Sequence, residues 1–161
     1  MMVDIRPAAL CDKDQILLIA KKAWAPVMTK MKPDVPGFAF EAFYPQGWWP
    51  RQSMDITALF QDMQTELFVA LSDGTVRGFM GLRQHPDDSM AEIYILGVDP
   101  DYQRQGLATA LMHFAELQTR QNGLSMLMVE TGGDLGHAAS RSAYEAFGFE
   151  RWPVARYFRR L

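Results

Sequence analysis

The spacing of hydrophobic and polar positions changes several times along the 161 residues, and these changes predict the order of the elements. Apolar residues recur at helical spacing from Ile16 to Val27, in a first segment that Asp12 can cap. The same spacing recurs at 51–63, 104–121 and 137–147. Alternating or continuous apolar runs predict strands at 3–6, 67–71, 76–84, 90–98, 124–130, 149–152 and 155–159. The resulting order is β-α-α-β-β-β-α-β-α-β-β, which favours one α/β (α+β) domain spanning 1–161 with a mixed sheet.

Local signals refine this outline. Asp73-Gly74 predicts a hairpin turn, and the continuous apolar run at 124–130 is typical of a strand inside a sheet. Residues 32–50 combine four prolines with many aromatic residues, so little helix is expected there beyond a short turn at 39–43. The helix at 137–147 is expected to bury its apolar positions, which are Ala139, Ala143, Ala146 and Phe147.

Composition narrows the classes of function. Hydrophobic residues make up 48% and charged residues 22%, as in ordinary globular proteins. A net charge of −3 argues against general nucleic-acid binding, which needs a basic surface. No apolar run approaches the about 20 residues of a membrane span, and no leader pattern is present, so we expect a soluble cytoplasmic protein without a membrane partner. Cys11 is the single cysteine, and the spacing of histidines and carboxylates predicts no metal site.

The most informative stretch runs from Ile93 to Thr109. An apolar, β-branched run stops at Asp99-Pro100, a polar turn with Gly106 follows, and a helical pattern begins. The first amides of a helix have no partner within the helix, so such a strand–turn–helix makes an anion site. Neither the nucleotide P-loop pattern nor the Rossmann glycine pattern is present.

Gln103, Gly106 and Ala108 match the pattern Gln/Arg-x-x-Gly-x-Gly/Ala. In this position, between a strand and a helix, the stretch closely resembles the acyl-CoA-binding signature of the GNAT N-acetyltransferase superfamily. The resemblance implies the GNAT fold, a mixed central sheet flanked by helices, with acetyl-CoA as co-substrate and no metal. It also implies that the donor is bound by the strand end and the turn, that is by Leu96, Gly97, Val98, Gln103, Arg104, Gln105, Gly106, Leu107, Ala108 and Thr109.

Glu92 is a candidate catalytic residue because it interrupts an otherwise apolar strand. Alternation places Glu92 and Tyr94 on one face, opposite Ile93 and Ile95. An ammonium group must lose a proton before its nitrogen attacks a thioester, and a carboxylate can accept that proton. In several members of the family that the chain resembles, a glutamate eleven residues before the signature glutamine is the general base. Glu92 and Gln103 have the same separation. The alternative is a half-exposed strand glutamate in a structural ion pair.

Tyr144 is the second candidate. Residues 137–149 resemble the family's Asn-x-x-Ala-x-x-x-Tyr-x-x-x-Gly-Phe segment: Tyr144, Gly148 and Phe149 match, whereas His137 and Ser140 replace the usual asparagine and alanine. The resemblance implies that the Tyr144 phenol protonates the departing thiolate. The alternative is a helix tyrosine packed against the sheet.

The acceptor is the least determined part. Aromatic side chains could contact an amine through cation–π interactions, and the candidates are Trp24, Phe38, Phe43 and Tyr94. A role as cover over the sheet is equally open, and His85 is interpreted as surface structure. We expect transfer of an acetyl group to the primary amine of a small molecule. The alternatives are a protein N-terminus or lysine as acceptor, and a non-catalytic acyl-CoA sensor. A homodimer is compatible with this fold.

Overall fold

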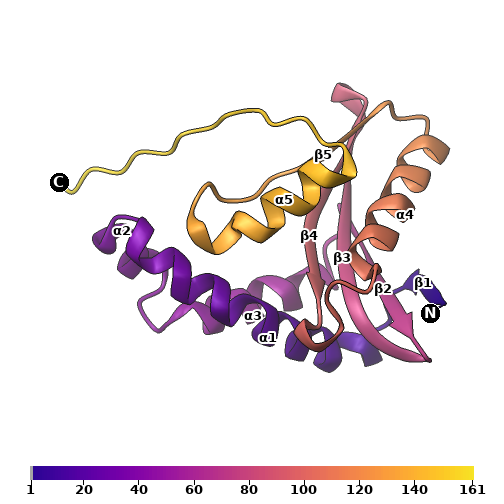
Figure 1. Cartoon of the computed structure of the whole chain (residues 1–161), viewed down its shortest axis with the longest axis horizontal. Coiled ribbons are helices and arrows are strands. Elements are labelled where there is room, and N and C mark those ends of the chain that lie inside the picture. Colours follow the sequence, from indigo (N-terminus) through magenta and orange to yellow (C-terminus); the bar gives the residue numbers. More distant parts are fainter. Residues whose placement is uncertain (1) are drawn as a thin grey trace. The chain divides into compact units, whose positions relative to one another are not determined.

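The computed structural model describes residues 2–161, in which five strands form one mixed sheet (Figure 1). The strands are β1 (Val3–Pro7), β2 (Thr65–Ser72), β3 (Thr75–His85), β4 (Met90–Val98) and β5 (Met126–Val129). They follow one another across the sheet in chain order. The first four pair antiparallel, and β5 pairs parallel to β4. The expected mixed sheet with flanking helices is therefore confirmed.

The helices are α1 (Lys13–Met31), α2 (Gly37–Phe43), α3 (Trp48–Leu59), α4 (Leu107–Gln121) and α5 (Ala138–Phe147). The chain divides into two compact units. The first contains the chain up to Ala23 together with Ser53–Glu130, and the second contains Trp24–Gln52 together with Thr131–Leu161. The single domain expected from the sequence stays a prediction.

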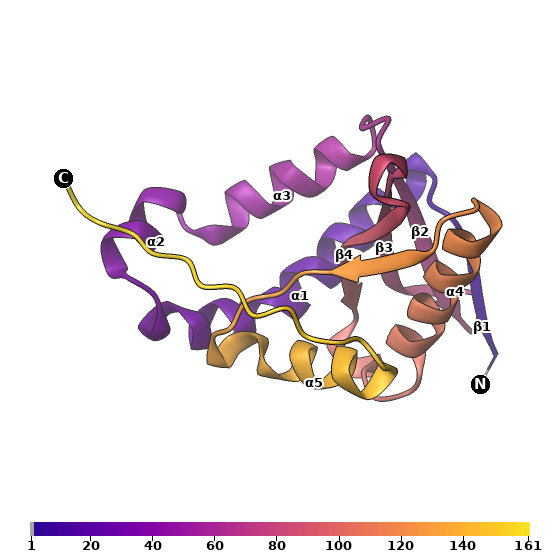
Figure 2. The same ribbon diagram turned by 90° about the horizontal axis from the view of Figure 1, so that it is seen from above.

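One face of the sheet in the first unit packs against α4 (Figure 2). Phe68 of β2 contacts Phe114 of α4, with ring centroids 4.8 Å apart. Gly78 of β3 lies so close to Leu111 that a Cβ there would be 3.4 Å from its side chain. Leu111 and its neighbour Met112 are almost fully buried. The apolar face predicted for the helix is thus the face that covers the sheet.

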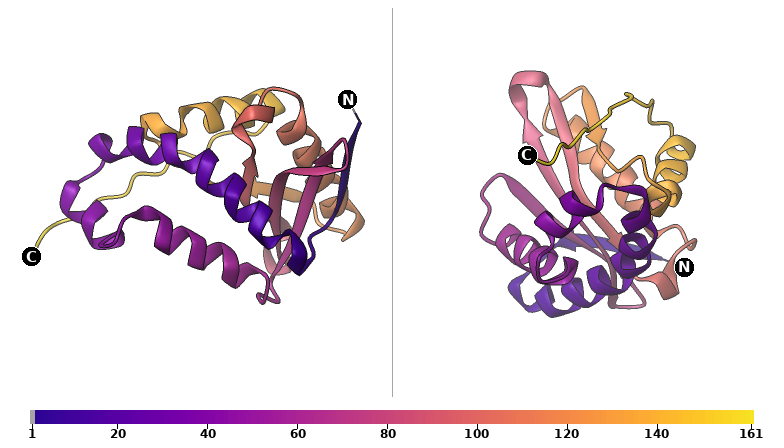
Figure 3. Two further views of the ribbon diagram at one scale, coloured as in Figure 1. Left: turned by 90° about the horizontal axis from the view of Figure 1, so that it is seen from below. Right: turned by 90° about the vertical axis from the view of Figure 1, so that its left-hand side faces the viewer.

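The other face of this sheet carries Val69 and Phe79, which are fully buried. The beginning of α1 and the end of α3 lie on this side (Figure 3) and contribute the buried residues Ile16, Ile19 and Ile56. Fully burying one such side chain stabilises the fold by about 1.5–3 kcal/mol. The two apolar layers fix the sheet as a rigid platform for the residues that project from its ends.

The second unit contains α2, α5 and a C-terminal segment. The two strands expected at 149–152 and 155–159 are not formed: the described chain beyond Phe149 has neither helix nor strand. The segment instead makes side-chain contacts with α2, where Phe158 packs edge-on against Phe43 and Arg160 lies 5.3 Å from the ring of Phe38. Alternation can predict a strand, but a strand also needs a backbone partner, and Pro153 has no N–H to offer one.

Four further expectations differ from the structure. A helix, α2, forms at 37–43 in the aromatic stretch, and α3 begins there too, at Trp48. The helix expected from residue 104 begins at Leu107. The apolar run at 124–130 yields only four strand residues at the edge of the sheet, not an interior strand. Finally, α5 has no buried residue, and the three alanines expected to be buried, at 139, 143 and 146, are exposed.

Asp99, just after β4, has one of the few buried carboxylates and lies among cationic side chains. Lys22 of α1 donates to its Oδ1 at 2.6 Å, and the Arg77 guanidinium lies 3.5 Å from its Oδ2. Desolvation alone would raise the pKa of the Asp99 carboxyl, but the Lys22 and Asp101 hydrogen bonds and the nearby cations lower it overall. The Asp99 amide also donates to the Arg77 carbonyl at 2.8 Å. These contacts tie the turn after β4 to α1 and β3.

We therefore predict that Asp99→Asn destabilises the protein by about 2 kcal/mol at pH 7, a value reduced from that of fully buried pairs because Lys22 is partly exposed. A lowered folded-state pKa contributes stability above the unfolded pKa, about 3.9, and this contribution is lost as the pH falls through the folded value. Urea unfolding from pH 7 down to pH 3 measures both effects. Equal stability of the two proteins at pH 7 would contradict the role given to Asp99.

Candidate functional site

The turn at 103–106 and the start of α4 form an open set of backbone amides. Gly106 caps α4 with φ +87°, a left-handed conformation that glycine adopts without strain. No side chain caps this helix start, and the first helical bond runs from the Ala110 amide to the Gly106 carbonyl. The amides of residues 107–109 are therefore available to an anion, and their role in binding acetyl-CoA stays a prediction. Arg104 and Gln105 belong to the turn rather than to the helix, which corrects the expected helix start.

Gln103 fixes this turn to the strand before it. Its Nε2 donates to the carbonyl of Val98, the last residue of β4, at 3.3 Å. Arg104 follows with φ +60°, an uncommon conformation for a non-glycine residue, and its side chain is exposed. The signature glutamine therefore has a structural task here, and the arginine adds positive charge beside the open amides.

Strand β4 changes its pairing in the middle. Ile93 pairs with Leu82 and Ile95 with Gly81, so Tyr94 is an extra residue in a β-bulge. Its neighbour β5 pairs only with Met90–Ile93 of β4. From Tyr94 onward, this edge of β4 has no strand partner in the described chain, which leaves the backbone of Leu96, Gly97 and Val98 available to a ligand. The sequence predicted that Ile95 lies on the face opposite Glu92, and this is wrong. The bulge turns Ile95 to the face of Gly81, which is also the face of Glu92.

Glu92 lies before the bulge, opposite Arg83 of β3, and its side chain is 19% exposed. The His85 Nε2 is 2.7 Å from its Oε2. Arg83 does not bind this carboxylate: it bonds Asp62 and Thr65, and it stacks 3.5 Å from the ring centroid of Tyr94. Glu92 is thus a half-buried carboxylate whose single hydrogen-bond partner among residues 2–161 is a histidine. Such a group can accept a proton.

Tyr144 lies on α5, in the second unit. Its ring packs edge-on against Phe149 at 5.9 Å, and its carbonyl accepts the Phe149 and Gly148 amides that end the helix. Burial raises the pKa of the Tyr144 phenol. The group is therefore protonated throughout the neutral range, as a proton donor must be.

Sequence reasoning missed the pairing of Asp134 with His137. The His137 Nδ1 lies 2.7 Å from Asp134 Oδ2, and its amide donates to Oδ1. Desolvation by burial opposes ionisation of Asp134, but the hydrogen bond and charge of His137 lower the carboxyl pKa overall. The signal was present in the sequence, since aspartate three residues before a histidine at a helix start is a capping pattern. His137, at the position where the family that the chain resembles usually has asparagine, is therefore paired with the carboxylate of Asp134.

The loop around this pair is tightly built. Arg141 of α5 donates to the carbonyls of Gly132 and Asp134, both at 2.6 Å. A Cβ on Gly132 would overlap the Asp134 carboxylate, and one on Gly136 would overlap the Val27 carbonyl oxygen of α1. These glycines are needed for close packing, because neither position has a left-handed φ.

The aromatic candidates are divided between the two units. Phe38 and Phe43 lie on α2 and contact the C-terminal segment, and Arg51 lies 5.1 Å from the ring of Phe43. Trp24 is half-buried on α1 in the same unit. Tyr94 belongs to the other unit and is 43% exposed, with Arg83 on its ring. A role for any of them in holding an acceptor stays a prediction.

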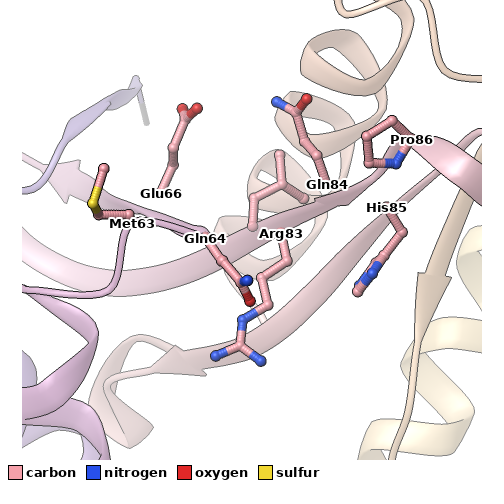
Figure 4. A pocket seen from close by; sticks show the side chains of 8 residues that line it. Met63, Gln64, Glu66, Arg83, Gln84, His85 and Pro86 are labelled. Carbon is pink, nitrogen blue, oxygen red and sulfur yellow. The ribbon is translucent and has the colours of Figure 1, made fainter.

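An open depression of about 400 Å³ lies where β2 begins and β3 ends (Figure 4). Its lining includes Gln64, Glu66 and Gln84, and it reaches Arg83 and His85, but Glu92 is not part of it. Within residues 2–161, no three His, Cys, Asp or Glu side chains gather as a metal site would require. None of the helices described is long and apolar enough to cross a membrane.

Comparison with known proteins places these features in context. The model of the Acetyltransferase (GNAT) family matches residues 35–149. Mycothiol acetyltransferase of Thermobispora bispora is 34% identical over 98 residues, which cover 58% of this chain and 32% of that protein. The chain thus spans about a third of the length of this curated relative.

Two solved structures share the fold. The PaiA N-acetyltransferase of Thermoplasma acidophilum, in complex with coenzyme A, aligns with a TM-score of 0.70 at 17% identity, covering 96% of this chain and 94% of that one. The aminoglycoside 6'-N-acetyltransferase AAC(6')-IG of Acinetobacter haemolyticus aligns with a TM-score of 0.68 at 16% identity, covering 98% of both chains. At these identities the likeness concerns the fold alone.

The tight loop yields a matched pair of variants. Gly136→Ala should destabilise the protein by about 2 kcal/mol, because its Cβ meets the Val27 carbonyl rather than a flexible side chain. Gly133→Ala is the control: a Cβ there meets nothing within 4 Å, so the change should stay within about 0.5 kcal/mol. Chemical denaturation of both variants measures the difference. Equal stabilities would mean that the loop adapts without strain.

Proposed function

Because the chain belongs to the Acetyltransferase (GNAT) family, we propose that it transfers an acetyl group from acetyl-CoA to the primary amine of a small molecule. The observation that carries this proposal is the continuity of the donor site. The unpaired edge of β4 at Leu96–Val98 leads, through the turn fixed by Gln103, to the uncapped amides after Gly106. An extended chain ending in a pyrophosphate suits such a backbone-lined path.

The residues present fit acetyl-CoA. Leu96, Gly97 and Val98 would pair with its arm, and residues 103–109 would hold its phosphates with backbone amides and the Arg104 charge. Acetyl-CoA supplies an acetyl group already activated as a thioester. The space beside Gly106 is open, because a Cβ built there would meet no atom within 4 Å, so a phosphate can approach the backbone closely. A residue with a side chain would also have to adopt a strained left-handed backbone at this position.

Two side chains are proposed to move protons. Glu92 takes a proton from the acceptor's ammonium, which frees the nitrogen lone pair for attack on the thioester carbonyl. The amides at the end of β4 polarise that carbonyl. Tyr144 donates its phenolic proton to the coenzyme A thiolate, and its raised pKa keeps that proton in place at neutral pH. The transfer is direct, with donor and acceptor bound together.

The small-molecule acceptor is supported by what similar proteins act on. The relative named above is a mycothiol acetyltransferase, and one solved neighbour acts on aminoglycosides by its name. Mycothiol and aminoglycosides are small molecules. A peptide N-terminus or lysine as acceptor, and a sensor without turnover, are the outcomes that compete with it.

A coenzyme A-release assay with acetyl-CoA across an amine panel tests the proposal. The panel contains spermidine, phenylethylamine, kanamycin, lysine and a set of N-terminal peptides. We expect turnover with at least one small amine at more than about tenfold the rate of any peptide, a difference of about 1.4 kcal/mol in the barrier. Faster peptide turnover would establish the second acceptor class. Binding of coenzyme A without turnover of any amine would establish a sensor.

The two proton-transfer residues should respond differently to substitution. Tyr144→Phe should lower kcat about 10²-fold, the usual worth of a positioned acid, with acetyl-CoA affinity nearly unchanged in calorimetry. Glu92→Gln should lower kcat/KM for the amine. It should also remove from the pH–rate profile the step that reports ionisation of the Glu92 carboxyl. An unchanged pH–rate profile in Glu92→Gln would exclude it as the base.

A further inference from the structure

All three histidines of the chain lie against a carboxylate, and one of these pairs includes the proposed base. His113 contacts Glu116 on the exposed surface of α4, and His137 contacts Asp134 in the tight loop. His85 contacts Glu92 at 2.7 Å, with side-chain exposures of 39% and 19%. The His85 pair alone links a half-buried carboxylate of the sheet platform to a side chain that reaches water.

The cross-strand neighbour of Glu92 explains why this contact matters. Arg83 is directly opposite Glu92 in the antiparallel ladder, where an ion pair is the ordinary outcome. Its guanidinium is held elsewhere: Nη2 bonds Asp62 at 3.0 Å, Nε bonds the Thr65 hydroxyl at 2.6 Å, and its plane lies on Tyr94. His85 and Arg83 project from the same side of β3 (Figure 4). The histidine therefore takes the place of the arginine as partner of the carboxylate.

The chemistry of the contact follows from its atoms. An ionised carboxylate has only lone pairs to offer, so the Nε2 of His85 must carry the hydrogen and donate it to Oε2. The other oxygen, Oε1, has no hydrogen-bond partner among residues 2–161 and is free to accept a proton. A carboxylate held by one oxygen presents the other in a fixed direction.

We propose that His85 is a positioning residue for Glu92: its Nε2–H holds Oε2 so that Oε1 receives the proton of the acceptor's ammonium. The inference rests on the proposed function. In the step itself, the N–H bond of the ammonium breaks, an O–H bond forms at Oε1, and the nitrogen keeps the electron pair for attack. Glu92 later releases this proton to water, and the Nε2–H of His85 is unchanged throughout.

The same contact makes the base sensitive to pH. Imidazole is the side chain that exchanges protons near neutrality, and a second proton on His85 would place a cation beside Glu92 and weaken it as a base. The other charged or titratable groups on the adjoining elements are Arg83, already bound to Asp62, the Tyr94 phenol, and the exposed Asp87 and Asp88 of the turn after β3. Strand β5 places the uncharged Met128 beside Glu92.

Two substitutions at position 85 separate the hydrogen bond from the charge. His85→Gln keeps an N–H donor that cannot gain a proton, and His85→Ala removes the donor. With the best amine of the panel, we expect His85→Ala to lower kcat about tenfold, the worth of one hydrogen bond to a charged group, with the KM for acetyl-CoA unchanged. His85→Gln should stay within about twofold of the parent above neutral pH and lose less activity on acidification.

The matched control is His113→Gln, which removes the exposed histidine–glutamate pair on α4 and should leave kcat and the pH profile unchanged. A second readout needs no turnover. With three histidines in the chain, ¹H–¹⁵N spectra resolve each ring, and His85 should be protonated on Nε2 in its neutral form. Glu92→Gln should change the Nε2–H signal of His85, because the acceptor of that hydrogen changes, and leave the ring signals of His113 in place.

These results also separate the inference from the proposed function. Parent-like kcat and pH profile in His85→Ala, with Glu92→Gln inactive, would overturn the role of His85 and leave the acetyltransferase intact. Absence of turnover with every amine would overturn the function, and the spectra would still decide on the pair. His85 ring signals unaffected by Glu92→Gln would overturn the pairing itself.

Discussion

The carboxylate of Asp99 is the charge on which the position of the turn after β4, the proposed donor site, depends. A carboxylate removed from water has to be matched by cations and hydrogen bonds, and here Lys22 of α1 and Arg77 of β3 supply the cations from two different elements. The end of β4 is thereby held at a fixed point. The chain continues from this point through the hydrogen bond of Gln103 to Val98 and the left-handed Gly106 to the start of α4. The buried ion pairs of Asp99 therefore help to fix the position of the open amides of α4.

The surroundings of Glu92, the proposed base, depend on how cations are distributed over a few carboxylates. Asp62 and Thr65 draw the Arg83 guanidinium away from the glutamate that it faces, and Tyr94 covers its plane. A glutamate paired with a permanent cation would be a poor base. The arrangement keeps the charge of Arg83 near the sheet while leaving Glu92 with a partner whose charge can change. Asp62, Thr65 and Tyr94 therefore determine both the packing of Arg83 and the surroundings of Glu92.

The sequence predicted those parts that short-range signals determine. Gln103, Gly106 and Ala108 identified the turn through their match to the family signature, and the first four strands followed from apolar runs closed by turn residues. The bulge at Tyr94 escaped prediction because it results from pairing with β3, not from its own residue type. The missing strands after Phe149 and the edge position of β5 depend on which backbone partners are available, whereas the Asp134–His137 pair follows from a local capping pattern.

The extra residue at position 94 divides β4 into two segments that are out of phase with each other. Before it, the strand is bonded on both edges and carries the glutamate; after it, the strand is bonded on one edge and offers its backbone. A substitution in the first segment changes a side chain without touching the main chain of the second. In the proposed site, one strand can therefore keep a constant donor half while its other half is altered to suit different acceptors, and a single deletion at the bulge would merge the two.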